Sequence, residues 1–342
     1  VDHVGVPGGG LIGVGSFAFD DDAPGSILTI PRVVVGRREG TTWLTTIDPE
    51  GASAAARPRD PAQPPAVVGR DRPRYAGSSN PDMHWLEAVA AGIERIKRGD
   101  AEKIVLARDV AVWSRERFDE VDLARRLTAR FPDCFTFVVD GLVGATPELL
   151  VARDGSRVIS RVLAGTAARS EDPEEDAAIG QALLDSEKDR WEHDLAVDSV
   201  EEVLAPRCHT LHHHDAPRLL RLDNVQHLAT DFAGELSGDT SSIELAGALH
   251  PTAAVGGTPR AEALQLIREL EGMDRGRYAA PVGWTTPDGD GEWGIALRCA
   301  QLEGARARLF AGVGIVSASL PEDELEETRI KLLAMQHALD AT

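Results

Sequence analysis

Segments with the alternating or β-branched pattern of strands run through most of this sequence, with amphipathic helices set between groups of them. In addition to several strands in the first 50 residues, the pattern predicts strands at residues 103–113, 135–163, 225–235, 281–285, 293–302 and 307–316. Asp154-Gly155 predicts a hairpin turn within the second of these stretches. A chain with this many strands of the antiparallel type is expected to fold as an α+β sandwich rather than as a doubly wound parallel sheet.

The predicted helices are recognised by apolar residues at helical spacing. They cover residues 85–96, residues 123–131 and, as one long helix, about residues 177–204. A last helix is expected to begin at Ser319-Leu320-Pro321-Glu322, which has the pattern of a capping box. Between residues 50 and 81 the composition shifts to Ala, Pro, Arg and Gly, which indicates an irregular surface loop.

The charge balance excludes several classes of function. Lys and Arg number 36 against 56 Asp and Glu, so the formal net charge is −20. Nucleic acids and anionic membranes are bound through clustered cationic side chains, so we expect neither of them as a partner. An anionic small molecule would need a local cationic pocket or a metal ion to bind to a chain of this charge.

The cysteines and the hydropathy pattern indicate the compartment. The three cysteines are odd in number and include no CxxC pair, which argues against a disulfide framework and for a reducing environment. No apolar run reaches the length of a membrane helix, and the N-terminus lacks the pattern of a signal peptide. We therefore expect a cytoplasmic protein.

Three local motifs are compatible with ligand binding but are weak on their own. Gly8, Gly10 and Gly13 match the glycine pattern of dinucleotide-binding folds, yet no strand precedes them and no helix follows, so we interpret them as a turn. The histidines between residues 209 and 214 are interpreted as a solvated loop and not as a zinc site. Residues 255–260, which open a predicted helix, are equally typical of a tight turn and of a backbone wall for a carboxylate.

Two predicted helices carry paired carboxylates. Asp189 and Glu192 are three residues apart and share a helix face, and Glu324 and Glu327 repeat this spacing in the last helix, one turn before Lys331. Two such pairs would suit Mg²⁺, which takes oxygen ligands completed by water and substrate. From spacing alone, surface charges with local ion pairs are the simpler interpretation.

Taken in chain order, several short motifs resemble those of the chorismate-utilising enzymes, and most closely those of the isochorismate synthases among them. The matching segments begin near residue 84 and include residues 102–108, 144–150, 164–169, 187–193, 249–252, 255–260, 278–284, 291–298, 312–316 and 321–331. The first 80 residues resemble the family only loosely. Many motifs in register are far more specific than any one of them, so the resemblance overrides the surface interpretation of the acidic helices.

The resemblance implies a single α+β domain over residues 1–342, in which two antiparallel sheets pack as a sandwich, are flanked by helices and hold the active site in the cleft between them. Within it, residues 1–80 would form an N-terminal β part, with the Pro- and Ala-rich loop at about residues 50–81, and residues 84–342 the chorismate-binding core. The implied reaction is the reversible, Mg²⁺-dependent isomerisation of chorismate to isochorismate. Water adds at C2 of the ring, the double bonds shift, and the C4 hydroxyl leaves.

The resemblance also implies roles for individual residues. Lys103 would be the base that activates the water, and Glu148 the acid that protonates the leaving hydroxyl, so the pKa of Glu148 is expected to be raised. Glu192 and Glu327 would bind Mg²⁺ directly, with Asp189 and Glu324 holding its bound waters. The substrate-binding residues implied in the same way are Gly165, Thr166, His250, Tyr278, Arg298, Gly312, Gly314 and Lys331.

The implied substrate contacts divide between the two carboxylates of chorismate. Arg298, with Tyr278, would bind the enolpyruvyl carboxylate, because a guanidinium fork matches a carboxylate in two hydrogen bonds. The glycines and Thr166 would let the backbone approach the other end of the substrate, where Lys331 would add positive charge. His250 either shapes the ring pocket or is a structural histidine.

Other activities of the same family remain alternatives. A salicylate synthase would form isochorismate and then eliminate pyruvate, but residues 250–260 look more like the branch that stops at isochorismate. The aminating relatives, anthranilate and aminodeoxychorismate synthases, are disfavoured by Lys103, and an inactive binding protein by the competent residue at every implied catalytic position. We expect a monomer with chorismate as its partner, and leave open whether its product feeds menaquinone, salicylate or a catecholate siderophore.

Overall fold

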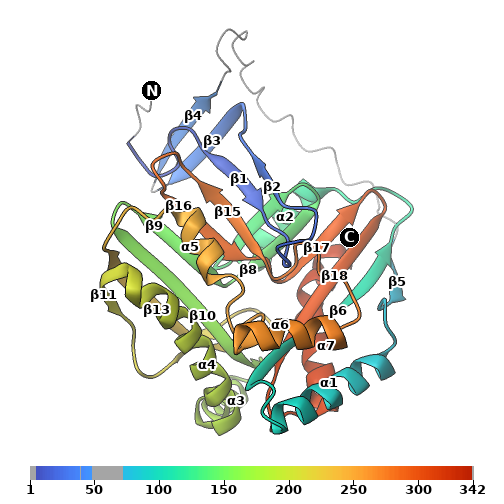
Figure 1. Cartoon of the computed structure of the whole chain (residues 1–342). Coiled ribbons are helices and arrows are strands. Elements are labelled where there is room, and N and C mark those ends of the chain that lie inside the picture. Colours follow the sequence, from blue (N-terminus) through green and yellow to red (C-terminus); the bar gives the residue numbers. More distant parts are fainter. Residues whose placement is uncertain (1–4, 39, 48–71, 341–342) are drawn as a thin grey trace.

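A computed structural model describes residues 5–38, 40–47 and 72–340 of the chain (Figure 1). Within these residues lie the helices α1 (Asp82–Lys97), α2 (Glu120–Arg130), α3 (Pro173–Asp185), α4 (Glu187–Leu204), α5 (Ser242–Leu249), α6 (Arg260–Leu270) and α7 (Pro321–Asp340). The strands form two large antiparallel sheets and a separate hairpin of β3 (Val33–Arg38) with β4 (Thr41–Thr46). None of the helices in the described residues is long and apolar enough to cross a membrane.

The first sheet has nine strands. Its order is β11 (Cys208–His212), β13 (Val225–Leu236), β10 (Arg157–Ala168), β9 (Leu149–Asp154), β16 (Gly291–Ile295), β15 (Pro281–Thr285), β1 (Gly13–Ser16) and β2 (Ile27–Thr29), and β12 (Arg218–Arg221) also pairs with β13. The predicted hairpin at Asp154-Gly155 is confirmed, because Asp154 of β9 pairs with Arg157 of β10 across it.

The second sheet has seven strands. Its order is β14 (Gly257–Thr258), β6 (Lys103–Trp113), β18 (Arg306–Ile315), β17 (Cys299–Glu303), β8 (Leu142–Thr146) and β7 (Phe135–Val139), and β5 (Arg74–Gly77) also pairs with β6. Side chains alternate along β6. Ile104 and Leu106 pack with α1 and α6, so Lys103 and Val105 face the opposite side, towards the first sheet.

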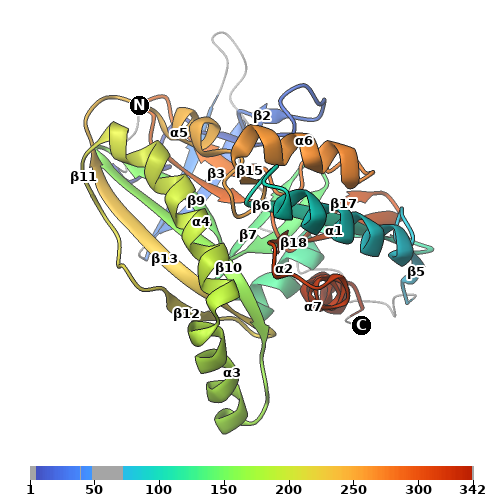
Figure 2. The ribbon, with the colours of Figure 1, turned by 60° about the horizontal axis from the view of Figure 1, so that its bottom comes forward.

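Helices α1, α6 and α7 pack against the second sheet, and α4 packs against the first. Figure 2 shows α1 and α6 near each other and α7 end-on, while α4 lies along β10 and β13. α2 and α7 share an apolar cluster with β8, β17 and β18. The face of α4 that meets the sheet is apolar and includes Ala196 and Val200.

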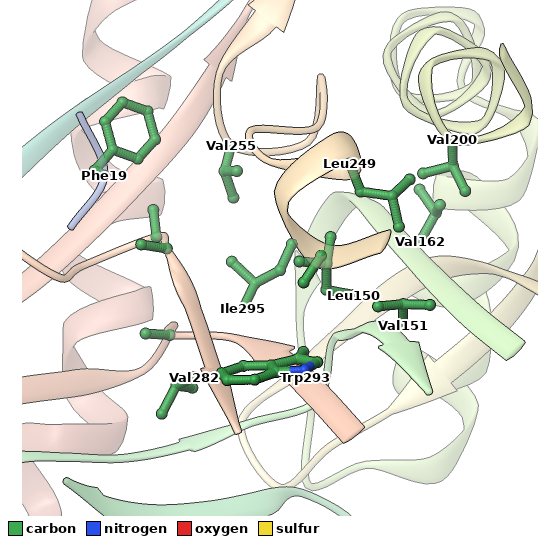
Figure 3. Packing of buried hydrophobic residues seen from close by; sticks show 14 of the residues in the cluster. Phe19, Leu150, Val151, Val162, Val200, Leu249, Val255, Val282, Trp293 and Ile295 are labelled. Atoms are coloured by element: carbon green, nitrogen blue, oxygen red, sulfur yellow. The ribbon is translucent and has the colours of Figure 1, made fainter. Parts of the chain in front are cut away.

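The largest apolar cluster joins the two sheets. It contains Phe310 of β18 as well as Val162 of β10 and Trp293 of β16, and Figure 3 shows part of it, with the Trp293 ring at its base. Two antiparallel sheets that share a core in this way, with helices around them, form the α+β arrangement predicted from the sequence. The additional β3–β4 hairpin was not expected as a separate sheet.

The single long helix predicted over residues 177–204 is wrong. The chain forms α3 and α4 instead, separated at Ser186, whose backbone is extended. The Ser186 hydroxyl accepts a hydrogen bond from the backbone N–H of Asp189 at 3.2 Å and so caps the new helix. Because of this break, α4 can run in a different direction from α3. The first turn of α4 carries Lys188 and Asp189.

The single strand predicted over residues 293–302 is also wrong. β16 ends at Ile295 in the first sheet and β17 begins at Cys299 in the second, so the chain crosses between the sheets here. Arg298 lies at the crossing with a φ of +48°, a left-handed conformation that few non-glycine residues adopt. The crossing brings the Arg298 side chain to the space between the sheets.

The loop predicted at residues 50–81 falls mostly outside the described residues. Its described end is not wholly irregular, since Arg74–Gly77 form β5 on the edge of β6. The capping box predicted at Ser319 does not form in the expected way either. The Ser319 hydroxyl accepts a hydrogen bond from the backbone N–H of Val316, which precedes the helix.

Candidate active site

A pocket lies between the two sheets, and most residues expected at the active site line it. Its cavity volume in this structure is about 50 Å³, which is below the range typical of ligand sites. The expected residues that line it are Glu148, Gly165, Thr166, Glu192, Tyr278, Arg298, Gly312, Gly314 and Lys331. A larger hollow lies between the β3–β4 hairpin and β7, but none of the expected residues lines it.

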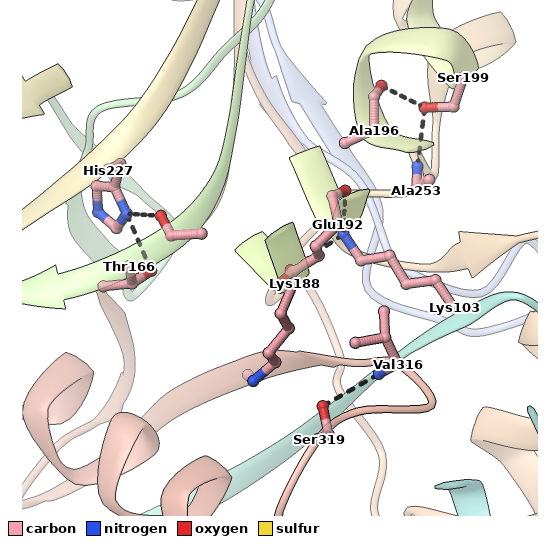
Figure 4. Close-up of polar contacts among 12 residues, drawn as sticks. Lys103, Thr166, Lys188, Glu192, Ala196, Ser199, His227, Ala253, Val316 and Ser319 are labelled. Carbon is pink, nitrogen blue, oxygen red and sulfur yellow. Dashed lines mark hydrogen bonds and ion pairs between the residues drawn. The ribbon is translucent and has the colours of Figure 1, made fainter. Parts of the chain in front are cut away.

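Lys103 is the first residue of β6, and its side chain is fully buried. Its Nζ lies 3.1 Å from Oε1 of Glu192 and 3.4 Å from the Glu192 carbonyl oxygen (Figure 4). Gly314 of β18 packs directly on this pair, and a Cβ there would overlap the Glu192 carboxylate and lie 2.9 Å from Cε of Lys103. A side chain at position 314 would therefore displace this ion pair.

Glu148 lies in the short link between β8 and β9 and is 3% exposed. Burial raises the pKa of its carboxyl group to about 8, although the charges of Lys103, Arg298 and Lys331 and a hydrogen bond from the backbone of Leu163 oppose the shift. The raised pKa expected from the sequence is thus present. At neutral pH Glu148 carries a proton and can donate it.

A histidine that the sequence analysis did not select holds Arg298 in the pocket. Nη2 of Arg298 lies 3.2 Å from Nε2 of His227, and Nδ1 of His227 lies 3.1 Å from Oγ1 of Thr166 and 3.3 Å from the Gly165 carbonyl oxygen. Figure 4 shows the His227 ring turned towards Thr166. A polar ring within the apolar pattern of β13 was the available signal, but its partners lie on other strands.

The protonation state of His227 follows from these contacts. Burial and the nearby charges of Arg298 and Lys331 hold the pKa of His227 well below its usual range, so the ring is neutral. A guanidinium can only donate, so Nε2 must accept from Arg298, and Nδ1 carries the hydrogen that the Gly165 carbonyl accepts. The neutral ring therefore orients the guanidinium without adding a second positive charge.

Tyr278, in the loop between α6 and β15, and Lys331 of α7 both line the pocket. The Tyr278 ring stacks on Phe310 with centroids 5.1 Å apart, and burial raises the pKa of its hydroxyl, which therefore stays protonated. Nζ of Lys331 donates to the Gly312 carbonyl oxygen at 2.9 Å and lies 2.6 Å from Oε1 of Glu327. Gly312 leaves room for Tyr278, because a Cβ there would lie 3.0 Å from the tyrosine hydroxyl.

Each of the four expected metal-binding carboxylates interacts electrostatically with at least one of the others. The pKa of Asp189 is raised by burial and by the charges of Glu192 and Glu327, and the pKa of Glu324 is raised by burial and by Glu327. Glu324 is paired with Lys188, whose Nζ lies 2.7 Å from its Oε1. Lysines 103, 188 and 331 thus each neutralise one glutamate of this cluster.

The chemistry of this donor set fits Mg²⁺. All four side chains offer oxygen, and a divalent cation would offset both the burial of Asp189 and Glu324 and the repulsion from neighbouring glutamates that together raise their pKa values. In the described residues no three His, Cys, Asp or Glu side chains are close enough to hold an ion by themselves. Mg²⁺ is commonly held through one or two carboxylates, with waters and substrate as its remaining ligands.

His250 is the one expected substrate-binding residue that does not line the pocket. Its Nε2 lies 3.0 Å from the Phe19 carbonyl oxygen, and its ring meets the Phe19 ring edge-on with centroids 5.4 Å apart. These contacts match the structural alternative that the sequence left open. The sequence did not indicate the contact between His250 and Phe19, because Phe19 belongs to the N-terminal part, which carries no motif.

The buried pair of Arg275 and Glu271 was also missed by the sequence analysis. Arg275 lines the pocket, and its guanidinium is shared between Glu271 and the carbonyl oxygens of Val105 and Val255. The Glu271 carboxylate accepts the backbone N–H of Ala107 at 2.7 Å. The pair therefore ties β6, which carries Lys103, to the loop before β14.

Comparisons with known proteins agree with this arrangement. Residues 3–340 match the family model described as "Chorismate binding enzyme". The chain is 38% identical to isochorismate synthase EntC of Escherichia coli over 94% of its length and 79% of the relative, and 41% identical to isochorismate synthase DhbC of Bacillus subtilis over 75% and 67%. Among solved structures, the menaquinone-specific isochorismate synthase MenF of E. coli superimposes with a TM-score of 0.81 at 26% identity, over 96% of this chain and 79% of that one.

Proposed function

The chain belongs to the family of chorismate-binding enzymes, and we propose that it is an isochorismate synthase, an isomerase that converts chorismate reversibly to isochorismate. The proposal is supported by Glu148, which lines the pocket between the sheets and is protonated at neutral pH, and by the buried amine of Lys103, which contacts Glu192 in the lining of the same pocket. We treat residues 1–342 as a single chorismate-binding domain.

The two groups have complementary tasks in this reaction. Lys103 accepts the proton of the water that attacks C2 of the ring, and Glu148 donates its proton to the hydroxyl that leaves C4. Because burial keeps the Glu148 proton in place up to a pKa of about 8, the acid is ready at neutral pH. In the reverse direction the same groups exchange tasks.

The binding residues fix the substrate between these groups. The Arg298 guanidinium, held by neutral His227, receives the enolpyruvyl carboxylate, and Tyr278 donates its hydroxyl hydrogen to the same group. Gly165, Thr166 and Gly312 to Gly314 leave room for the ring end of the substrate. Lys331, anchored on the Gly312 carbonyl, contributes positive charge there.

We propose Mg²⁺ as the cofactor, with Glu192 and Glu327 as direct ligands and Asp189 and Glu324 as acceptors for its bound waters. The bound ion would neutralise the ring carboxylate and stabilise the negative charge that develops as the double bonds rearrange. The side chains of the protein keep their own tasks: Lys103 handles the proton at C2, and Glu148 the proton at C4.

The decisive experiment is to incubate chorismate with the purified protein, with and without Mg²⁺, and to separate the products by chromatography. We expect isochorismate in equilibrium with chorismate, and loss of turnover when EDTA removes the metal. Fluorescent salicylate formed without a second enzyme would instead identify a salicylate synthase. An aminated product that depends on added ammonia would identify an anthranilate or aminodeoxychorismate synthase.

A second prediction concerns Glu327. Glu327→Gln keeps the shape of the side chain but removes the charge that Mg²⁺ needs, so the Mg²⁺ concentration for half-maximal activity should rise by roughly 10–100-fold. The measurement is an Mg²⁺ titration of turnover at saturating chorismate. Glu326→Gln is the matched control, because Glu326 is the neighbouring exposed residue and pairs with Arg329. Equal metal dependence of the two variants would count against Glu327 as a ligand.

The proposed setting of the enzyme is the cytoplasm, and its proposed form is a monomer whose partner is chorismate. Its relatives are named for different routes, since MenF of E. coli is the menaquinone-specific enzyme and a Pseudomonas aeruginosa relative is the salicylate biosynthesis enzyme. Both of these relatives are named isochorismate synthases. The product assay above therefore tests the activity independently of the pathway that uses it.

A further inference from the structure

Lys188 is a charged residue at the site that none of the roles above uses. It lies in the first turn of α4, and its Nζ donates to Oε1 of Glu324 on α7 at 2.7 Å. The Glu324 side chain is 2% exposed, whereas that of Lys188 is 31% exposed. The pair therefore joins a fixed, buried carboxylate to a lysine that reaches it from the surface.

The pair also connects two different parts of the fold. α4 packs on β10 of the first sheet, and α7 packs on β18 of the second. These helices provide the two pairs of carboxylates proposed to hold the metal, so Lys188 spans the acidic cluster from one side to the other. Figure 4 shows Lys188 extending from α4, away from Lys103 and Glu192.

Lys188 differs from the other two lysines of the cluster in its freedom to move. Lys103 is fully buried against Glu192, and Lys331 is held by the Gly312 carbonyl as well as by Glu327. For Lys188, Glu324 is the only hydrogen-bonded partner found in the described part of the chain. A partly exposed lysine on its flexible four-carbon stem can turn its amine out to water, while Glu324 stays where it is.

We propose that Lys188 is a displaceable counter-ion that competes with the divalent cation for Glu324. The lysine and a cation with its bound waters would both use the oxygen atoms of this carboxylate. The positive charges of the lysine and the cation would then repel each other. Glu192 and Glu327 also act electrostatically on Lys188, so the competition extends to the direct ligands. The inference rests on the proposed metal site and adds to it a residue that sets the affinity for the metal.

The test is a binding measurement and needs no turnover. Mn²⁺, which electron paramagnetic resonance detects when free, is titrated into wild-type protein, Lys188→Met and Lys188→Gln in the absence of chorismate. We expect both neutral variants to bind Mn²⁺ about tenfold more tightly than the wild type, and Lys188→Arg, which keeps the charge, to bind within about threefold of it. Mg²⁺ should displace the Mn²⁺, with the same order among the variants.

Lys97→Met is the matched control, because it removes the same charge from an exposed site on α1, where Lys97 pairs only loosely with Glu94. It should leave the affinity for Mn²⁺ unchanged. Unchanged or weaker binding by Lys188→Met and Lys188→Gln would overturn the inference while leaving the metal site intact. Absence of Mn²⁺ binding in the wild type and in all variants would overturn the metal site itself, and the inference with it.

Discussion

Lys103→Ala should reduce turnover of chorismate by roughly 10²–10⁴-fold, the contribution typical of a positioned general base. The substitution removes the amine proposed to accept the proton of the attacking water but leaves Arg298 and Tyr278 in place. Binding of chorismate, measured by calorimetry, should therefore remain detectable. The variant is read in a kinetic assay at saturating chorismate and Mg²⁺, with isochorismate quantified by chromatography.

The burial of Lys103 requires a second variant, because alanine leaves a cavity and an unpaired Glu192. Lys103→Met fills the space without supplying an amine and should be equally inactive. Small primary amines added to the buffer should restore part of the activity of Lys103→Ala, whose cavity can admit them, and should not rescue Lys103→Met. Near-wild-type turnover in either variant would reject Lys103 as the base.

Glu148→Gln should have an effect of the same size on turnover, again roughly 10²–10⁴-fold, because an amide has no acidic proton to give to the leaving hydroxyl. The wild-type enzyme should lose kcat/KM as the pH rises through about 8, the pKa of Glu148, since the proposed acid acts in its protonated form. Turnover of the variant within a few-fold of the wild type would eliminate Glu148 as the acid.

Glu148→Gln, which should lower turnover, should raise the stability of the protein at high pH. The folded chain keeps the Glu148 proton up to a pKa of about 8, whereas the ordinary value is 4.5, so between these pH values the unfolded chain binds fewer protons and the stability of the wild type falls as the pH rises. Glutamine does not titrate. Glu148→Gln should therefore be more stable than the wild type at pH 9, by on the order of a few kcal/mol, and the difference should vanish at pH 4, as measured by urea unfolding.

Much of the fold was predictable because strand and helix periodicities are local. β6 occupies the predicted residues 103–113, and the alternation along it determines that Lys103 shares a face with Val105. The three-residue spacing of Asp189 and Glu192 places both carboxylates near the beginning of α4. These features depend on neighbours within one turn or one strand, and such neighbours are visible in a single sequence.

The predictions of one long helix and one long strand were wrong because local periodicity does not show where the chain breaks or turns. Residues 293–302 keep a strand-like pattern through Arg298, although the left-handed backbone there turns the chain from one sheet into the other. Helical periodicity likewise continues across Ser186, whose hydroxyl caps a new helix. In both places a single residue with an unusual backbone or hydrogen bond decides the path of the chain.

The charge pairing within the site was not accessible from the sequence for a related reason. The family resemblance pointed to a metal site at the paired carboxylates, but the lysine partners of Glu192 and Glu324 lie on other elements, and Lys188 and Glu324 are 136 residues apart. His227 was missed because its two partners, Thr166 and Arg298, are equally remote. Such pairs become visible only when the sheets are assembled.

The pairing of β6 with β18 has a consequence for how this protein is made. The two strands are neighbours at the centre of the second sheet, and the ion pair between Asp109 and Arg308 across them spans 199 residues of chain. Closing so long a loop is entropically costly, and a sheet built on such contacts folds slowly. During synthesis, β6 can pair with β18 only after the chain has been made as far as Arg308. Lys103, the proposed base, lies at the start of β6 and is therefore translated long before the strand that pairs with it.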